Sequence, residues 1–248
     1  MTHDSLGWRQ KFAVLVPSTN TSVQPEFDDM RPPGVTNHIS RIRIPNMPLN
    51  TNEDFERLIS LIEAAQDEAV DAAMSCEPTR LVLGISAETF WGGLGASRRF
   101  KQHLEERTKL PVSMGSDACD AAFAALGLKT IAVVTPYQPV GDQNVIRFFE
   151  ESGYQVKRIK GLKCESPVKI AHVQEPELRA ALQELDGDDI DGLVQVGTNL
   201  AMARLAAQAE VWLDRPVVAI NTAIYWHALR ASGIEDKVGG FGSLLERH

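Results

Sequence analysis

Short apolar runs alternate with amphipathic segments along the whole chain. The runs predict buried strands near 11–16, 35–44, 80–84, 111–114, 130–137, 154–159, 192–196 and 216–221. Between them, apolar residues recur every three or four positions, which predicts helices over 52–74, 97–108, 117–126, 142–152, 175–185, 200–210 and 223–232. Strands that alternate with helices favour parallel sheets covered on both faces, so we expect an α/β fold.

The order of elements in the first part of the chain recurs in the second part. Three pairs of corresponding strand residues follow the same order in both parts: Val14 and Val133, Val82 and Val194, and Val112 and Val217. The number of residues that separates the members of a pair decreases slowly from the first pair to the last. We expect two α/β halves, the first from 1–118 together with 222–248 and the second from 119–221. The alternative is that any chain in which strands alternate with helices shows similar correspondences without a duplication, and it stays open at this point.

Polar residues stand where the central strands end. They occupy 18–22, Ser86, 135–137, and Thr198 with Asn199. Ligands of parallel sheets bind beyond the carboxyl ends of the strands, and the helices that follow point free backbone N–H groups toward an anion. We therefore expect a cleft between the halves that binds a carboxylate or a phosphate.

Composition and charge narrow the choice of partners and cofactors. The chain of 248 residues has a formal net charge of −8, which argues against nucleic acid or an anionic membrane as a partner. No apolar run approaches the roughly 20 residues of a membrane span, and no signal peptide opens the chain, so we expect a cytoplasmic protein. The three cysteines lack disulfide or metal spacing, and dinucleotide and P-loop motifs are absent. We expect no cofactor and no metal.

Three segments resemble the maleate cis-trans isomerase and arylmalonate decarboxylase family of the aspartate/glutamate racemase superfamily. Residues 16–26 (VPSTNTSVQPE) are similar to the isomerase signature VPSSNTTxExE. Residues 126–137 (LGLKTIAVVTPY) and 221–229 (NTAIYWHAL) are similar to further blocks of the family. The resemblance implies two pseudo-symmetric flavodoxin-like halves with parallel sheets and the active site between them. A homodimer is common among such relatives.

The resemblance also implies two cysteine positions, one at the end of each central strand, and this chain has glycine at both. Maleate isomerases use both cysteines, and arylmalonate decarboxylases keep only the second. Gly84 stands at the first position and Gly197 at the second. The family's usual thiol chemistry therefore has no residue at its usual place.

The residues that bind a carboxylate in the family have closer matches in this chain than the two cysteines have. The resemblance places Ser86 and Tyr137 at a carboxylate or its enediolate, and Asn20 at the substrate-binding asparagine of the signature. Neighbouring polar and backbone groups complete the candidate binding set of Asn20, Thr21, Gly84, Ser86, Ala87, Gly197, Thr198 and Asn199. Ser86 and Thr198 could instead merely cap helices.

Glu88, Tyr137 and Cys119 are the candidates for proton transfer. Beside Phe90 and Trp91, the carboxylate of Glu88 is expected to have a raised pKa suited to general acid–base catalysis, although a first-turn acid that favours the helix dipole is an alternative. Cys119 is expected in the first turn of a helix, which lowers a thiol pKa, unless it is a buried structural cysteine.

Three functions remain compatible with the sequence. The first is a cofactor-independent isomerase or decarboxylase that acts on a small carboxylate or dicarboxylate through a stabilised enolate without the usual cysteines, or a hydrolase variant with water activated by Glu88. The second is a cysteine enzyme that uses Cys119 or Cys164 instead. The third is a non-catalytic carboxylate-binding protein.

Overall fold

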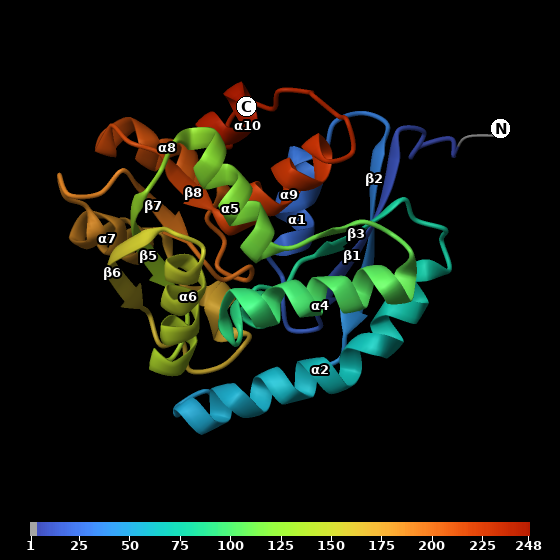
Figure 1. Ribbon diagram of the computed structural model, residues 1–248, viewed down its shortest axis with the longest axis horizontal. Helices are drawn as coiled ribbons and strands as arrows, with labels where there is room; N and C mark the ends of the chain where they lie inside the picture. The colour runs from blue at the N-terminus through green and yellow to red at the C-terminus, as the bar shows by residue number, and fades with distance from the viewer. Residues whose placement is uncertain (1–3) are drawn as a thin grey trace.

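Two four-stranded parallel sheets form the centre of the computed structural model, which describes residues 4–248 (Figure 1). The first sheet has the order β2-β1-β3-β4, with β1 (Gln10–Pro17), β2 (Val35–Ile42), β3 (Arg80–Leu83) and β4 (Val112–Ser113). The second has the order β6-β5-β7-β8, with β5 (Thr130–Thr135), β6 (Gln155–Gly161), β7 (Gly192–Gln195) and β8 (Val217–Ala219). The equivalent orders and the parallel pairing confirm the predicted α/β fold.

Helices cover both sheets. They are α1 (Val23–Met30), α2 (Asn52–Met74), α3 (Ala87–Phe90), α4 (Gly93–Thr108), α5 (Gly115–Leu126), α6 (Pro139–Glu151), α7 (Glu175–Leu185), α8 (Ala203–Leu213), α9 (Ile220–Arg230) and α10 (Ser243–Arg247), with a short 3-10 helix at Lys169–His172. The sequence pattern missed α1, α3 and α10, which are too short for a clear apolar period. Among residues 4–248, no helix has the length and apolar content that crossing a bilayer requires.

Several boundaries differ from the expected ones for local reasons. Helix α6 begins at Pro139, earlier than expected, because proline fits the first turn of a helix. Strand β8 ends at Ala219 and α9 begins at Ile220, so Asn221 lies in a helix rather than in the predicted strand. Helix α5 stops as predicted at Gly127, whose φ of 71° is the left-handed conformation of a helix C-cap.

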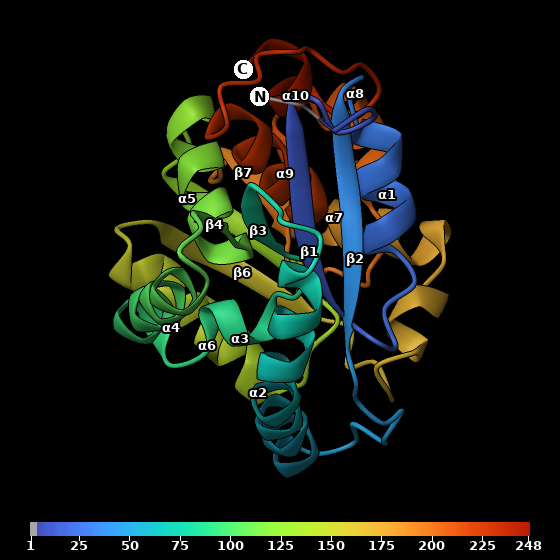
Figure 2. The same ribbon diagram turned by 90° about the vertical axis from the view of Figure 1, so that its right-hand side faces the viewer.

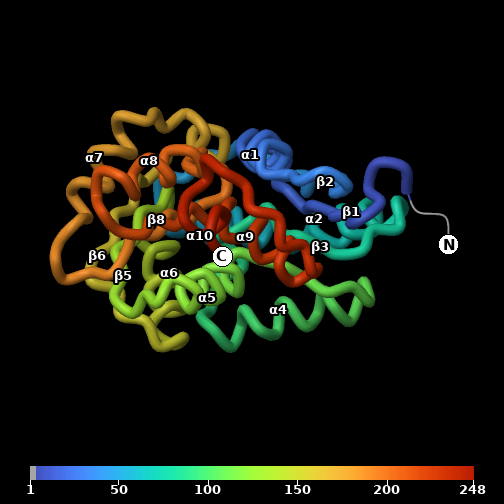
Figure 3. The backbone as a smooth tube through the Cα atoms, turned by 90° about the horizontal axis from the view of Figure 1, so that it is seen from above, coloured from blue at the N-terminus to red at the C-terminus, as the bar shows by residue number. Residues whose placement is uncertain are grey.

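One apolar cluster joins the two halves. On β1, Phe12, Val14 and Val16 point into it, and on β5, Ile131 and Val133 do. The intervening residues of each strand point into an outer cluster that belongs to that half alone. Helices α5 and α9 pack against each other between the sheets, as the view from above shows (Figure 3). The shared cluster fixes the sheets relative to each other and brings the carboxyl ends of their central strands together.

Helix α2 bridges the halves at the carboxyl ends of the first sheet (Figure 2). It starts with a capping box, in which the Thr51 side chain accepts from the Asp54 backbone N–H and the Asp54 side chain accepts from that of Thr51. Its amino-terminal part then reaches across to contact α6 of the second half. The helix therefore closes one side of the space beyond the strand ends.

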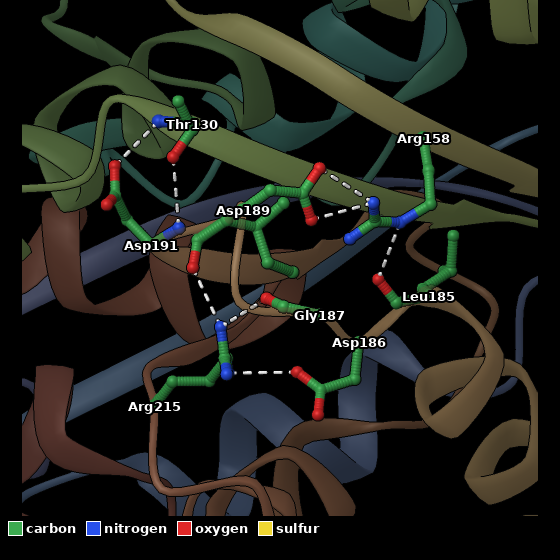
Figure 4. A network of polar contacts seen from close by, with 9 residues as sticks. Thr130, Arg158, Leu185, Asp186, Gly187, Asp189, Asp191 and Arg215 are labelled. Carbon is green, nitrogen blue, oxygen red and sulfur yellow. Dashed lines mark hydrogen bonds and ion pairs between the residues drawn. The ribbon is translucent and has the colours of Figure 1, made fainter.

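A polar network lies at the amino ends of the strands in the second sheet, away from the carboxyl ends (Figure 4). Arg158 on β6 forms an ion pair with Asp189 at 2.8 Å and donates to the Leu185 carbonyl. Arg215 donates to the Gly187 carbonyl at 2.8 Å and forms an ion pair with Asp186. These contacts hold the connection before β7 against its neighbours, so the strand enters the sheet in a fixed register.

Candidate functional site

A small cavity lies where the carboxyl ends of β1, β3, β5 and β7 meet. It has a volume of about 60 Å³. The four strand-end loops contribute residues from 17–20, 85–88, 136–138 and 197–199, and α2 contributes an apolar wall of Phe55, Leu58 and Ile62. The loops around 44–49 and 164–170 complete the lining. The position is the one predicted for a ligand site in this class of fold.

Two hydroxyl groups meet in the cavity, one from each half. Ser86 Oγ and Tyr137 Oη lie 2.7 Å apart, and both side chains are buried. Burial raises the pKa of Tyr137, so the phenol keeps its proton. The mutual hydrogen bond uses one of the two hydroxyl protons. The other remains for an oxygen atom of a ligand, whichever group donates in the pair.

Thr198, in the loop after β7, joins this pair. Its backbone N–H donates to Ser86 Oγ at 3.1 Å, and its hydroxyl donates to the Gly84 carbonyl at 3.0 Å. Asn20 donates from Nδ2 to Thr198 Oγ1 at 3.2 Å. The structure thus brings together residues from all four predicted strand-end loops, and it orients Ser86 from both sides.

Asn20 and Asn199 mainly hold loops in place. Asn20 Oδ1 accepts from the backbone N–H groups of Ser22 and Val23 and so satisfies free donors at the start of α1. Asn199 accepts from the Thr21 backbone N–H at 2.9 Å and donates to the Pro167 carbonyl. Both asparagines line the cavity, whereas Thr21 does not. Their side chains are occupied within the protein, which leaves the hydroxyl pair as the clearest donor to a ligand.

In the part of the chain that the structure describes, Glu88 is the one acidic residue that lines the cavity. It lies on α3, is only 5% exposed, and neither carboxylate oxygen has a hydrogen-bond partner. Desolvation by burial raises its pKa from the ordinary value of 4.5 to about 7. The rise of the Glu88 pKa is in the predicted direction. Phe90, which was expected beside the carboxylate, packs on Phe148 and Phe149 in the shared cluster. Ala87 also lines the cavity, beside Glu88.

The two glycines predicted to stand at cysteine positions of the family, Gly84 and Gly197, are closely surrounded by other residues. Gly197 lines the cavity with a φ of 125°, and a Cβ there would lie 2.4 Å from Pro136 Cδ. A Cβ on Gly84 would point away from the cavity and meet Val23 Cγ1 at 2.8 Å and Val16 Cγ2 at 2.9 Å. Neither position accommodates a side chain without movement of its neighbours.

The cysteines occupy different environments. Cys119 is fully buried in α5 within the shared cluster and does not line the cavity. The expectation that the helix start lowers its pKa is wrong, because desolvation raises the pKa of this thiol. Cys164 does line the cavity, and burial raises its pKa to about 11. Both thiols are therefore protonated at neutral pH.

Behind the cavity, Glu26 and Asn221 form a hydrogen-bonded pair that the sequence pattern did not reveal. Asn221 Nδ2 donates to Glu26 Oε2 at 2.6 Å and to the Thr198 carbonyl at 2.9 Å. Glu26 also accepts from the Ala203 backbone N–H, and burial raises the pKa of its carboxyl. Glu26 and Asn221 each lie in a family-like segment, which was the available signal. Only the fold shows that the two meet at the 197–199 loop.

Comparison with known proteins agrees with the fold. The arylmalonate decarboxylase family model matches residues 13–245. The maleate isomerase of Pseudomonas putida is 25% identical over 95% of this chain and 96% of its own. A Nocardia farcinica maleate cis-trans isomerase mutant with a covalently bound succinylcysteine intermediate superposes with a TM-score of 0.87 at 22% identity, covering 96% of this chain and 99% of that one.

An arylmalonate decarboxylase structure superposes with a TM-score of 0.73 at 20% identity, covering 96% of this chain and 100% of that chain. These structural likenesses confirm the two-sheet fold. The family model covers nearly all of the chain, from β1 to α10. The chain therefore belongs to the arylmalonate decarboxylase family.

Proposed function

We propose that this protein is a cofactor-independent enzyme of the isomerase or decarboxylase type, which acts on a small carboxylate through an enolate-like intermediate without a cysteine. The observation that carries the proposal is one cavity lined both by a hydroxyl pair with a free proton and by Glu88, whose buried, unpartnered carboxylate has a raised pKa. The hydroxyl pair then recognises the anion and Glu88 transfers the proton, at one and the same cavity.

The hydroxyl pair is suited to stabilise developing negative charge. A substrate carboxylate oxygen accepts the free proton of the Ser86–Tyr137 pair. When the adjacent carbon loses a proton or carbon dioxide, the electron pair left on that carbon delocalises onto the carboxylate oxygens. A donor already in position then strengthens its interaction without reorganisation, and such donors typically contribute about 10²–10³ in rate.

Glu88 is suited to carry the proton. A pKa of about 7 leaves both protonation states populated near neutral pH. In an isomerisation, the ionised carboxylate takes the proton from the α-carbon and returns it. In a decarboxylation, the neutral acid gives its proton to the carbanion that remains after carbon dioxide leaves, and water restores it. The thiol of Cys164 is a poorer candidate because its pKa of about 11 disfavours the thiolate.

Substitution in the hydroxyl pair tests this function. We expect Tyr137→Phe and Ser86→Ala each to lower turnover about 10²-fold or more, because each removes a hydroxyl from the oxyanion site. Turnover is measured by NMR in D₂O at pH 6 and pH 8, as formation of the trans isomer from maleate, or as deuterium incorporation at the α-carbon or loss of carboxylate for substituted malonates and their half-amides.

Tyr154→Phe is the matched control, since Tyr154 Oη donates to Asp120 Oδ1 at 2.6 Å outside the cavity lining. It should keep nearly full turnover. Full turnover in Tyr137→Phe would contradict the role of the pair. Saturable carboxylate binding with no turnover of any compound would favour a binding protein instead.

A further inference from the structure

Apart from the hydroxyl pair, most of the cavity wall is apolar. Phe55, Leu58 and Ile62 face it from α2, and Leu49 and Ile170 face it from the two covering loops. Within the described residues, no lysine, arginine or histidine lines the cavity. An anionic ligand therefore meets hydroxyl and backbone donors there, but no cation.

Among residues 4–248, Glu88 is the only charged side chain of this lining, and its carboxylate has no hydrogen-bond partner. Both oxygens are inaccessible to solvent and accept no hydrogen bond. The other titratable groups around it are Glu63 from α2, which adds negative potential, and Tyr137 and Cys164, which stay neutral. Buried polar groups in native proteins are usually hydrogen-bonded, so this carboxylate marks a place where a ligand donor is missing.

A second carboxylate on the ligand would not fit this place. Two like charges in a cavity of about 60 Å³ would repel each other with little solvent screening. A carboxamide or an ammonium group, in contrast, offers N–H donors to the carboxylate. Both Glu88 oxygens are unpartnered but shielded, so a turn of the side chain toward the cavity lets one accept such an N–H while the other remains for proton transfer.

We propose, on the premise of the carboxylate-binding function above, that the cavity selects ligands with one carboxylate and an N–H donor group, and discriminates against dicarboxylates. The single carboxylate lies at Ser86 and Tyr137, a short apolar linker lies against the α2 wall, and the amide or amine donates to Glu88. The substrate class is thereby narrowed to half-amides or amino-substituted carboxylates and, because the single carboxylate must stay to receive the electron pair, the reaction to the isomerase type.

Four probes of similar length test this selection. Succinate, succinamate, 4-aminobutyrate and butyrate are titrated calorimetrically into the wild-type protein at pH 8. We expect succinamate or 4-aminobutyrate to bind at least tenfold more tightly than succinate, with the better of the two identifying an amide or an ammonium ligand.

Variants then assign the selection to Glu88. In Glu88→Gln, succinate should bind within threefold of succinamate at pH 8. Glu63→Gln makes the same charge change at an exposed position of α2 and should keep the tenfold selection. Succinate that binds wild type as tightly as both N–H probes overturns the selection but not the carboxylate site. No binding by any of the four probes overturns both.

Discussion

Replacing Gly197 with alanine is expected to lower the free energy of unfolding by about 3–5 kcal/mol. Two causes add. The φ of 125° is a conformation that residues with a side chain rarely adopt, and the new Cβ would lie 2.4 Å from Pro136 Cδ and 2.6 Å from Pro136 Cγ. Pro136 precedes Tyr137, so the displacement would also disturb the hydroxyl pair. Urea denaturation followed by circular dichroism measures the loss.

Gly153→Ala separates these two causes. Gly153 has a φ of 90°, and a Cβ there would meet nothing within 4 Å. We expect it to cost only about 1–2 kcal/mol, from backbone strain alone. Equal losses at the two positions would show that the contact with Pro136 is unimportant.

Replacing Glu88 with glutamine is expected to make the protein more stable above neutral pH. The pKa of Glu88 is about 7 in the folded protein, against an ordinary value of 4.5. Between these two values the unfolded chain has released a proton that the folded protein retains, so stability falls by about 1.4 kcal/mol per pH unit. Above pH 7 the full penalty, on the order of 3 kcal/mol, is present. Glutamine removes it.

The measurement is the difference in unfolding free energy between Glu88→Gln and wild type at pH 4.5 and at pH 8. Comparing two pH values cancels any constant cost of the amide. We expect the difference to favour the variant at pH 8 by on the order of 3 kcal/mol more than at pH 4.5. Glu63→Gln, at an exposed position of α2, should show no comparable gain. Parallel pH profiles for Glu88→Gln and wild type would show that this carboxylate is not desolvated.

The strand ends were the most predictable part of the site. In a parallel sheet their carboxyl ends share one edge, so the polar residues after β3, β5 and β7 had to converge once the duplication was recognised. Ser86, Tyr137 and Thr198 do meet there, at 2.7–3.1 Å. The family resemblance added which of these polar groups would face a carboxylate.

Other parts of the site depend on tertiary packing that no local pattern records. The apolar period of α2 predicts a buried face, but it does not say that Phe55, Leu58 and Ile62 border a cavity rather than the core. Cys119 was placed correctly on a helix, yet its side chain points into the shared cluster, where desolvation outweighs the helix dipole. Cys164 reaches the cavity only because the loop after β6 folds back over β5, with its N–H bonded to the Pro136 carbonyl at 3.0 Å.

The most direct test of cysteine-free chemistry is the turnover of a variant that lacks all three thiols, Cys76→Ala with Cys119→Ala and Cys164→Ala, measured beside Glu88→Gln. The substrate is the compound from the NMR panel that wild type converts fastest. We expect the thiol-free variant to keep turnover within about threefold of wild type and Glu88→Gln to lose about 10²-fold or more, the usual range for a general acid–base group. Loss of turnover in the folded thiol-free variant, with turnover kept in Glu88→Gln, would contradict the proposed mechanism.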